Sequence, residues 1–162
     1  MTPAVRAIFK RDLRRWFGNP TGYVFIALFV VLASVAMFWP EEFFTSNLAN
    51  LDTLNHWFPL LLLFFIPAVT MSVLAGDRSQ GTDELLLTLP VSDTQVILGK
   101  FSAAAGIYSV ALLFCAPLLL YLSYLGDPDW GLMAANFLGF WVLGVVLISA
   151  GLVGSQLSDN LT

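Results

Sequence analysis

DRSQGTDELLLTLPVSDTQVILGK, residues 77–100, is a polar island between two long uncharged stretches of a 162-residue chain. The island holds two of the seven basic residues and four of the eleven acidic residues. Charged side chains are costly in hydrocarbon, so a segment of this composition is expected to face water. The apolar stretches on both sides predict that it connects two membrane helices.

The first half of the island predicts a short helix. Thr82 is a suitable N-cap, and Asp83 and Glu84 follow it in the first turn, where the helix dipole favours negative charge. A dense leucine patch comes next, and Pro90 ends the helix.

A second helix is predicted to start at Ser92 and to continue into the next apolar stretch. Ser92 and Gln95 have the spacing of a capping box, and Val91 and Val96 flank the start as a hydrophobic staple. A short helix with a leucine face between two spans could rest on lipid headgroups, or it could dock on another protein.

Residues 81–92, GTDELLLTLPVS, resemble the cytoplasmic coupling segment of ABC-2 type transporter permeases, typically E-x-x-x-G-T-x-E-x-L-L-x-x-P-V-S, with the gliding-motility-type branch closest. The family usually has glutamates where this chain has Gly76 and Asp77. In that family the segment docks on a separate ATPase subunit. The resemblance therefore implies an ATPase-coupling role for Asp77, Gly81, Thr82, Asp83, Glu84, Leu85, Leu86, Thr88 and Pro90.

Composition places the chain among membrane proteins without reference to any family. It is 58% hydrophobic and 11% charged, which is far from an ordinary soluble domain. Four uncharged runs exceed the ~18–20 residues that cross the ~30 Å hydrocarbon core. They predict four transmembrane helices, within residues 21–39, 57–76, 101–125 and 132–157.

The basic residues predict the orientation. All seven lie before the first span or in the island, and the loops 41–52 and 127–129 have five acids and no Lys or Arg. Positive residues favour the cytoplasmic side, so the N-terminus and the island are expected inside, in a bacterial inner membrane. The single Cys115 is mid-span, so no intrachain disulfide can form.

Residues 3–17 predict an amphipathic helix in the inner interface. Val5, Ile8, Phe9, Leu13 and Trp16 recur at helical spacing. The basic face is expected to carry Lys10, Arg11, Arg14 and Arg15 and to meet anionic lipid, with the aromatic side chains of the helix in the acyl boundary. Asp12 falls near the apolar side and is expected to pair with Arg15. The alternative is a positive flank without ordered structure. ABC-2 permeases carry a comparable elbow helix, and Gly18-Asn19-Pro20 is expected to end it.

Several other residues are expected to have structural roles in the loops and spans. Phe43 and Phe44 are expected in the outer interface, Pro59 near the start of the second span, and Pro67 at a kink. The third span is expected to run to about residue 125 with Pro117 in its outer half. An aromatic belt is predicted on the outer side, formed by Trp39, Trp57, Tyr121, Tyr124 and Trp130. Asp127 and Asp129 offer too few oxygens for calcium and indicate a turn.

The fourth span has small residues at spacings that let helices approach closely. Ala150 with Gly154, and Gly151 with Ser155, predict a packing face, either within the chain or against a second copy. Trp141 is near mid-bilayer, where it could line a substrate path or pack against lipid or protein.

The chain lacks the residues for several chemistries. It has no G-x-x-x-x-G-K-[ST] phosphate loop, and no span contains Asp, Glu, Lys, Arg or a histidine pair. No catalytic residue, metal ligand or bound cofactor is therefore predicted, and no nucleic-acid partner. Any ATP and Mg²⁺ would be bound by a partner ATPase.

The sequence thus predicts an all-α polytopic membrane protein that resembles the permease subunit of an ABC exporter. The expected partners are an ABC ATPase subunit, a second permease copy or a related permease, and membrane lipids. The rival hypothesis is a small non-transporting assembly or scaffold protein of the membrane. ABC-2 permeases generally carry six spans, so two further spans are expected beyond residue 162, which sequencing downstream would test.

Overall fold

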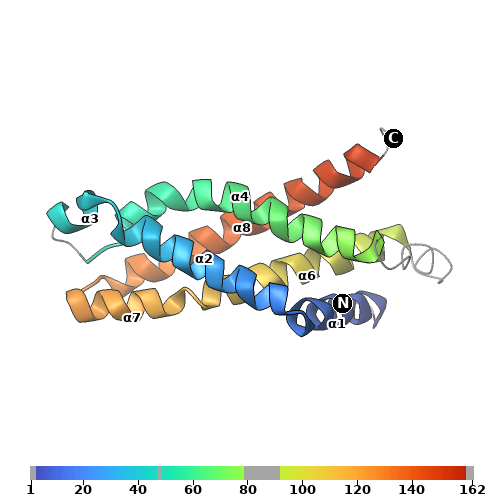
Figure 1. Cartoon of the computed structure of the whole chain (residues 1–162), viewed down its shortest axis with the longest axis horizontal. Helices are drawn as coiled ribbons and strands as arrows, with labels where there is room; N and C mark the ends of the chain where they lie inside the picture. Colours follow the sequence, from blue (N-terminus) through green and yellow to red (C-terminus); the bar gives the residue numbers. More distant parts are fainter. Residues whose placement is uncertain (1–2, 47–48, 79–91, 160–162) are drawn as a thin grey trace.

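The four apolar runs form long helices that lie beside one another in the computed structural model, which describes residues 3–46, 49–78 and 92–159 (Figure 1). The spans are α2 (Pro20–Phe38), α4 (Asp52–Arg78), α6 (Asp93–Leu113) with α7 (Ala116–Leu125), and α8 (Trp130–Asp159). Their apolar parts are 19 to 32 residues long, with mean hydropathies from 1.7 to 2.3. The predicted all-helical protein with four membrane spans is confirmed.

Two shorter helices lie at opposite ends of the bundle, α1 (Pro3–Gly18) and α3 (Glu41–Ser46) (Figure 1). The predicted break after α1 is present. Asn19 is the N-cap of α2, where its side-chain oxygen accepts a hydrogen bond from the Thr21 amide at 3.3 Å. Pro20 takes the first helical position, which needs no amide hydrogen.

The third span is interrupted, which the prediction of one continuous helix missed. α6 ends at Leu113 and α7 begins at Ala116. The Cys115 amide donates to the Leu112 carbonyl at 3.0 Å, a tighter turn than the α-helix makes. Pro117, in the first turn of α7, has no amide hydrogen for the Leu113 carbonyl, and in a continuous helix its ring would clash with that carbonyl. The chain therefore leaves the helix and restarts.

The second span begins five residues earlier than predicted, because the polar residues before it are part of the helix start. The Asp52 amide donates to the Asn50 side chain at 3.4 Å, and the Asn50 amide group donates to the Asp52 carboxylate at 2.6 Å. Pro59 consequently lies inside α4, seven residues after Asp52, and not near its start as predicted. α4 stays one helix across both Pro59 and Pro67.

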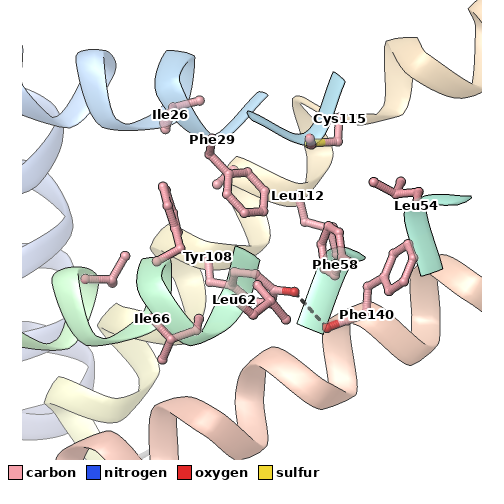
Figure 2. Close-up of a cluster of buried hydrophobic side chains, with 14 of the residues drawn as sticks. Ile26, Phe29, Leu54, Phe58, Leu62, Ile66, Tyr108, Leu112, Cys115 and Phe140 are labelled. Carbon is pink, nitrogen blue, oxygen red and sulfur yellow. Dashed lines mark hydrogen bonds between the residues drawn. The ribbon is translucent and has the colours of Figure 1, made fainter. Parts of the chain in front are cut away.

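Aromatic side chains fill the core between α2, α4, α6 and α8 (Figure 2). Phe58 of α4 stacks on Phe140 of α8, with ring centroids 3.9 Å apart. Tyr108 of α6 is fully buried, and its hydroxyl donates a 2.7 Å hydrogen bond to the Phe140 carbonyl. Because lipid is as apolar as these residues, close packing and this bond hold the helices together more than the hydrophobic effect does.

The end of the bundle that carries α3 exposes most of its aromatic residues. Trp39, Trp57, Tyr121, Tyr124 and Trp130 are all exposed, as a belt at a membrane interface requires. Phe43 and Phe44 behave differently from the prediction that both enter lipid. Phe44 is 65% exposed, but Phe43 is only 5% exposed. The Phe43 ring packs against the Phe38 ring, with centroids 5.1 Å apart, because α3 folds back over the end of the core.

Asp129 is used as a helix cap. Its carboxylate accepts hydrogen bonds from the Gly131 amide at 2.9 Å and the Leu132 amide at 3.2 Å, both in the first turn of α8. The predicted role of this aspartate in turn chemistry is confirmed.

Candidate functional site

The helices that flank the predicted coupling segment end together, at the end of the bundle that carries α1 (Figure 1). α4 ends at Arg78 and contains Asp77 in its last turn; α6 begins at Asp93. The other eight predicted coupling residues, the Thr82 cap and Val91 of the predicted staple lie outside the described residues. The structure therefore defines the frame that holds this segment.

The start of α6 is at the predicted place, but the predicted capping box is absent. Ser92 has the extended backbone of an N-cap, with φ −74° and ψ 147°, yet its side chain makes no bond to a helix amide. Its hydroxyl pairs with the Thr94 hydroxyl at 3.0 Å. The backbone N–H of Gln95 donates instead to the Ser92 backbone carbonyl, at 2.9 Å.

α1 packs against α6, its most extensive partner. Val5 and Ile8 are buried. A Cβ atom at Gly99 of α6 would lie 2.7 Å from Cγ2 of Ile8, and one at Gly106 would lie 3.1 Å from the Phe9 ring. The apolar stripe of α1 therefore contacts protein. The Phe9 ring lies against Gly106, whereas the prediction placed the aromatic side chains of this helix in the acyl boundary.

Sequence analysis missed the role of Gly99 and Gly106. The two glycines are seven residues apart, almost two full helical turns, and so lie on one face of α6. That spacing is the signal that could have identified this face as a site of close helix approach.

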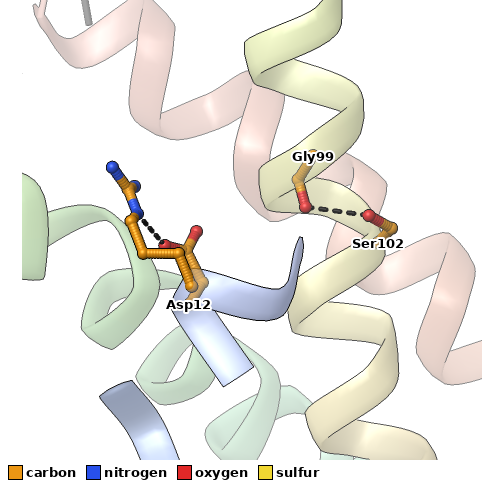
Figure 3. A network of polar contacts seen from close by, with 4 residues as sticks. Asp12, Gly99 and Ser102 are labelled. Carbon is orange, nitrogen blue, oxygen red and sulfur yellow. Dashed lines mark hydrogen bonds and ion pairs between the residues drawn. The ribbon is translucent and has the colours of Figure 1, made fainter. Parts of the chain in front are cut away.

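The basic residues of α1 are divided between the two sides of the helix. Lys10 and Arg14 are exposed, whereas Arg11 and Arg15 are partly covered. Arg11 Nε donates to the Asp12 carboxylate at 2.9 Å, and Asp12 is 6% exposed (Figure 3). Asp12 thus forms an ion pair with its neighbour Arg11, and the expected pairing with Arg15 stays a prediction. A carboxylate so buried needs a nearby cation to remain charged.

α1 also reaches α4. The Trp16 indole Nε1 donates a 3.3 Å hydrogen bond to the Ser72 hydroxyl, which itself donates to the Val69 carbonyl at 2.8 Å. Aromatic contacts continue from Trp16 into the bundle. The ring centroids of Trp16 and Phe25 are 6.1 Å apart, and those of Phe25 and Phe65 are 4.3 Å apart. α1 therefore contacts both helices that carry the coupling segment.

The contact between α1 and α6 can be trapped. We expect Ile8→Cys with Gly99→Cys to form a disulfide under mild oxidation, since the two Cβ atoms would be closer than the ~3.8 Å that a disulfide needs and small adjustments would separate them. Loss of maleimide labelling after oxidation would report the bond. Arg6→Cys with Gly99→Cys is the matched control, because Arg6 is exposed on the opposite side of α1. Equal cross-linking in both pairs would contradict this packing.

The four predicted packing residues of α8 have different surroundings. Gly151 faces α4, where a Cβ atom would lie 3.2 Å from the Thr70 side chain. Ala150 and Gly154 are exposed, and nothing lies within 4 Å of the Cβ position of Gly154. The side chain of Ser155 lies outside the description. Pairing of the exposed face with a second copy stays a prediction.

Trp141 ties α8 to α6. Its indole Nε1 donates a 2.9 Å hydrogen bond to the Ser109 hydroxyl, a residue that sequence analysis did not select. Hydrogen bonds between membrane helices average about 0.6 kcal/mol, so this bond contributes modestly to the α6–α8 contact. Trp141 remains 44% exposed.

Residues 6–160 match the model of a protein family described as "ABC-2 family transporter protein". The chain belongs to the ABC-2 transporter family. It is 30% identical to the ABC transporter permease protein NatB of Bacillus subtilis (strain 168), over 57% of this chain and 28% of that protein. It is 31% identical to the probable ABC transporter permease protein NosY of Stutzerimonas stutzeri, over 91% of this chain and 54% of that protein. No solved structure matches.

This ABC-2 family chain thus spans between about a quarter and about half of the lengths of these two relatives. The family match covers α1 from Arg6 onwards, all four spans and the predicted coupling segment. In the described part of the chain no group of three or more His, Cys, Asp or Glu side chains could hold a metal ion. The described residues form a multi-pass membrane bundle. In it, α1 contacts both α4 and α6, the two helices that flank the predicted coupling segment.

Proposed function

We propose that this chain is the membrane permease subunit of an ATP-binding-cassette exporter, driven by ATP hydrolysis on a separate ATPase subunit. The observation that carries the proposal is the family match over residues 6–160, which includes the segment that resembles the family's ATPase-docking site. Both relatives are named as ABC transporter permeases, in agreement with this assignment.

The proposed coupling runs from residues 77–92 into the spans. In this proposal the partner ATPase, and not this chain, binds Mg²⁺ and ATP and hydrolyses the ATP. A displacement of the segment would move the end of α4 and the start of α6 directly, because both are continuous with it. α1 contacts α6 at Gly99 and Gly106 and α4 at Ser72, so it would transmit part of the same displacement to both helices. Asp77, in the last turn of α4, would be the first coupling residue to move with the helix.

The finer assignments rest on the charge distribution and the resemblance. We assign the chain to a bacterial inner membrane with the N-terminus, α1 and the island in the cytoplasm, since all seven basic residues lie on that side. We further assign it to the gliding-motility-type branch, as one of two permease copies or one of a related pair. The two further spans expected downstream remain a prediction.

The orientation predicts opposite accessibility for two engineered cysteines. Ser79→Cys, in the island, should react with an impermeant maleimide only from the cytoplasm, and Ser46→Cys, at the end of α3, only from outside. Native Cys115 is buried and provides an unlabelled background. Labelling of both positions from one side would overturn the assignment.

The proposed function is tested by co-purification. The full-length protein, extracted in mild detergent, should retain an ATPase subunit that carries a phosphate-loop motif, and vesicles containing both should hydrolyse ATP. A scaffold protein would be isolated without a stoichiometric ATPase, and that result would refute the proposal.

A further inference from the structure

The interruption between α6 and α7 lies near the middle of the membrane (Figure 1). At 1.5 Å per residue, residues 101–113 of α6 are about 20 Å long, and α7 is about 15 Å long. The hydrocarbon core is about 30 Å thick. Phe114 and Cys115, which belong to neither helix, therefore lie close to the midplane, and no charged residue follows Lys100 in α6 or α7.

Two backbone carbonyls at the interruption have lost the donor that a continuous α-helix provides. Pro117 has no amide hydrogen for the Leu113 carbonyl. The Phe114 carbonyl would accept from the Leu118 amide in a continuous helix. That amide donates instead to the Cys115 carbonyl, at 3.0 Å. The chain thus presents two acceptors at a depth where hydrocarbon offers no donor.

The groups beside the interruption are polar, but their hydrogens are already used. Ser109, one turn before Leu113, donates its hydroxyl hydrogen to the Ala105 carbonyl at 2.7 Å, and it accepts the Trp141 indole hydrogen at 2.9 Å. Ser109, Leu113 and Trp141 line an open pocket of about 330 Å³ between α6, α7 and α8. Leu113 is 70% exposed and Phe114 is 56% exposed, so the described part of the chain leaves the interruption open.

We infer that this interruption faces a water-filled space in the assembled protein, where water donates hydrogen bonds to the Leu113 and Phe114 carbonyls. Non-helical backbone at membrane depth is tolerated where protein buries it or where it lines water, and not against lipid. A bound water needs about two to four polar partners. The two carbonyls and the Ser109 hydroxyl oxygen meet that requirement. The inference rests on the membrane bundle and not on the proposed transport function.

A protein helix is the less favourable cover for these carbonyls. A membrane helix uses its own backbone N–H groups internally, so it can bond to the carbonyls only through side chains. In a second copy, the described serine side chains of the spans already donate to carbonyls of their own helices, as Ser34 does to Val30 and Ser149 to Val146. The further spans expected downstream would have to direct a donor side chain at each carbonyl. Water meets both acceptors without such a match.

Spin labels distinguish water, lipid and protein as the cover. Leu113→Cys and Phe114→Cys, each combined with Cys115→Ala, are labelled with a nitroxide in the full-length protein. The protein is reconstituted in phosphatidylcholine bilayers with any subunits that co-purify with it. Electron paramagnetic resonance then measures how often the label collides with a water-soluble nickel chelate and with oxygen, which concentrates in hydrocarbon.

Val31→Cys, also with Cys115→Ala, is the matched control. Val31 is 57% exposed on α2, which has no interruption. By residue count it lies about 12 Å from Trp39, whereas Leu113 lies about 18 Å from Leu125 at the end of α7. Depth alone would therefore make Val31 the wetter of the two positions.

We expect the label at Leu113, which lines the pocket, to collide with the nickel chelate several times more often than the label at Val31. The label at Phe114 provides the same comparison if Leu113→Cys does not fold. Nickel collisions as rare as at Val31 would overturn the inference: frequent oxygen collisions would then identify lipid as the cover, and rare oxygen collisions would identify protein. Neither measurement involves ATP hydrolysis, so failure of the transport proposal would leave this result intact.

Discussion

Replacing Gly144 by leucine is expected to destabilise the bundle more than any other single change in the described part of the chain. Gly144 of α8 faces Tyr108 of α6, and even a Cβ atom at this position would overlap the Tyr108 ring. That ring is fully buried, and its hydroxyl is bonded to the Phe140 carbonyl. The ring cannot move aside without losing this bond and its packing, so the two helices must separate.

The expected loss is about 3 kcal/mol, the upper part of the usual range for overpacking a core. Thermal unfolding in detergent, followed by the exposure of buried Cys115 to a thiol-reactive dye, would measure it. Gly139→Leu is the matched control on the same helix, because nothing lies within 4 Å of its Cβ position. The gain in helix propensity on replacing glycine is the same at both sites. The control is expected to change stability by no more than about 0.5 kcal/mol.

A double variant separates overpacking from other effects. Tyr108→Ala removes the ring that the new side chain would strike, so Gly144→Leu should cost much less in that background than alone. Additive losses would contradict the contact between Gly144 and Tyr108. Equal shifts for Gly144→Leu and Gly139→Leu would contradict it as well.

The second large effect is expected at the coupling segment, where Leu86→Asp or Glu84→Lys should uncouple ATP hydrolysis from transport. In the proposed complex Leu86 belongs to the leucine face that meets the ATPase. A charge introduced into such a contact costs several kcal/mol unless it is paired. Because each 1.4 kcal/mol corresponds to a factor of ten, coupled transport should fall roughly ten- to a hundredfold.

Transport per ATP hydrolysed, in vesicles that contain the complex, is the measurement. The amount of inserted protein should not change, because neither residue belongs to a span. Asp127→Lys, in the turn at the opposite end of the bundle, makes a similar acid-to-lysine change and should leave coupling intact. Normal coupling in both island variants would refute docking, and weakened membrane contact with normal coupling would favour a segment that rests on lipid.

Local composition was sufficient for the architecture of this protein. Each span is long and apolar enough to cross the hydrocarbon by itself, so its existence depends on no other part of the chain. The break at Asn19 and the cap at Asp129 are also local, because a side chain there bonds to an amide two or three residues away. The resemblance that identified the family likewise lies within one continuous segment.

Only the tertiary structure decided which residues of the spans contact one another. Gly139 and Gly144 look alike in the sequence, yet one faces open space and the other a buried ring. Phe43 and Phe44 are neighbours, and only one is buried. Asp12 lies in a helix that was predicted to be interfacial, yet it is only 6% exposed.

The physical reason is the composition of the spans themselves. A helix of a soluble protein shows its inner face by an apolar stripe, but α6 and α8 are apolar on almost every side. Their rotation and register are set by the shapes that fit together, such as Tyr108 against Gly144 or Ile8 against Gly99. Those fits join residues far apart in the chain. Hydropathy therefore determined that the helices cross the membrane, and side-chain packing alone determined how they face each other.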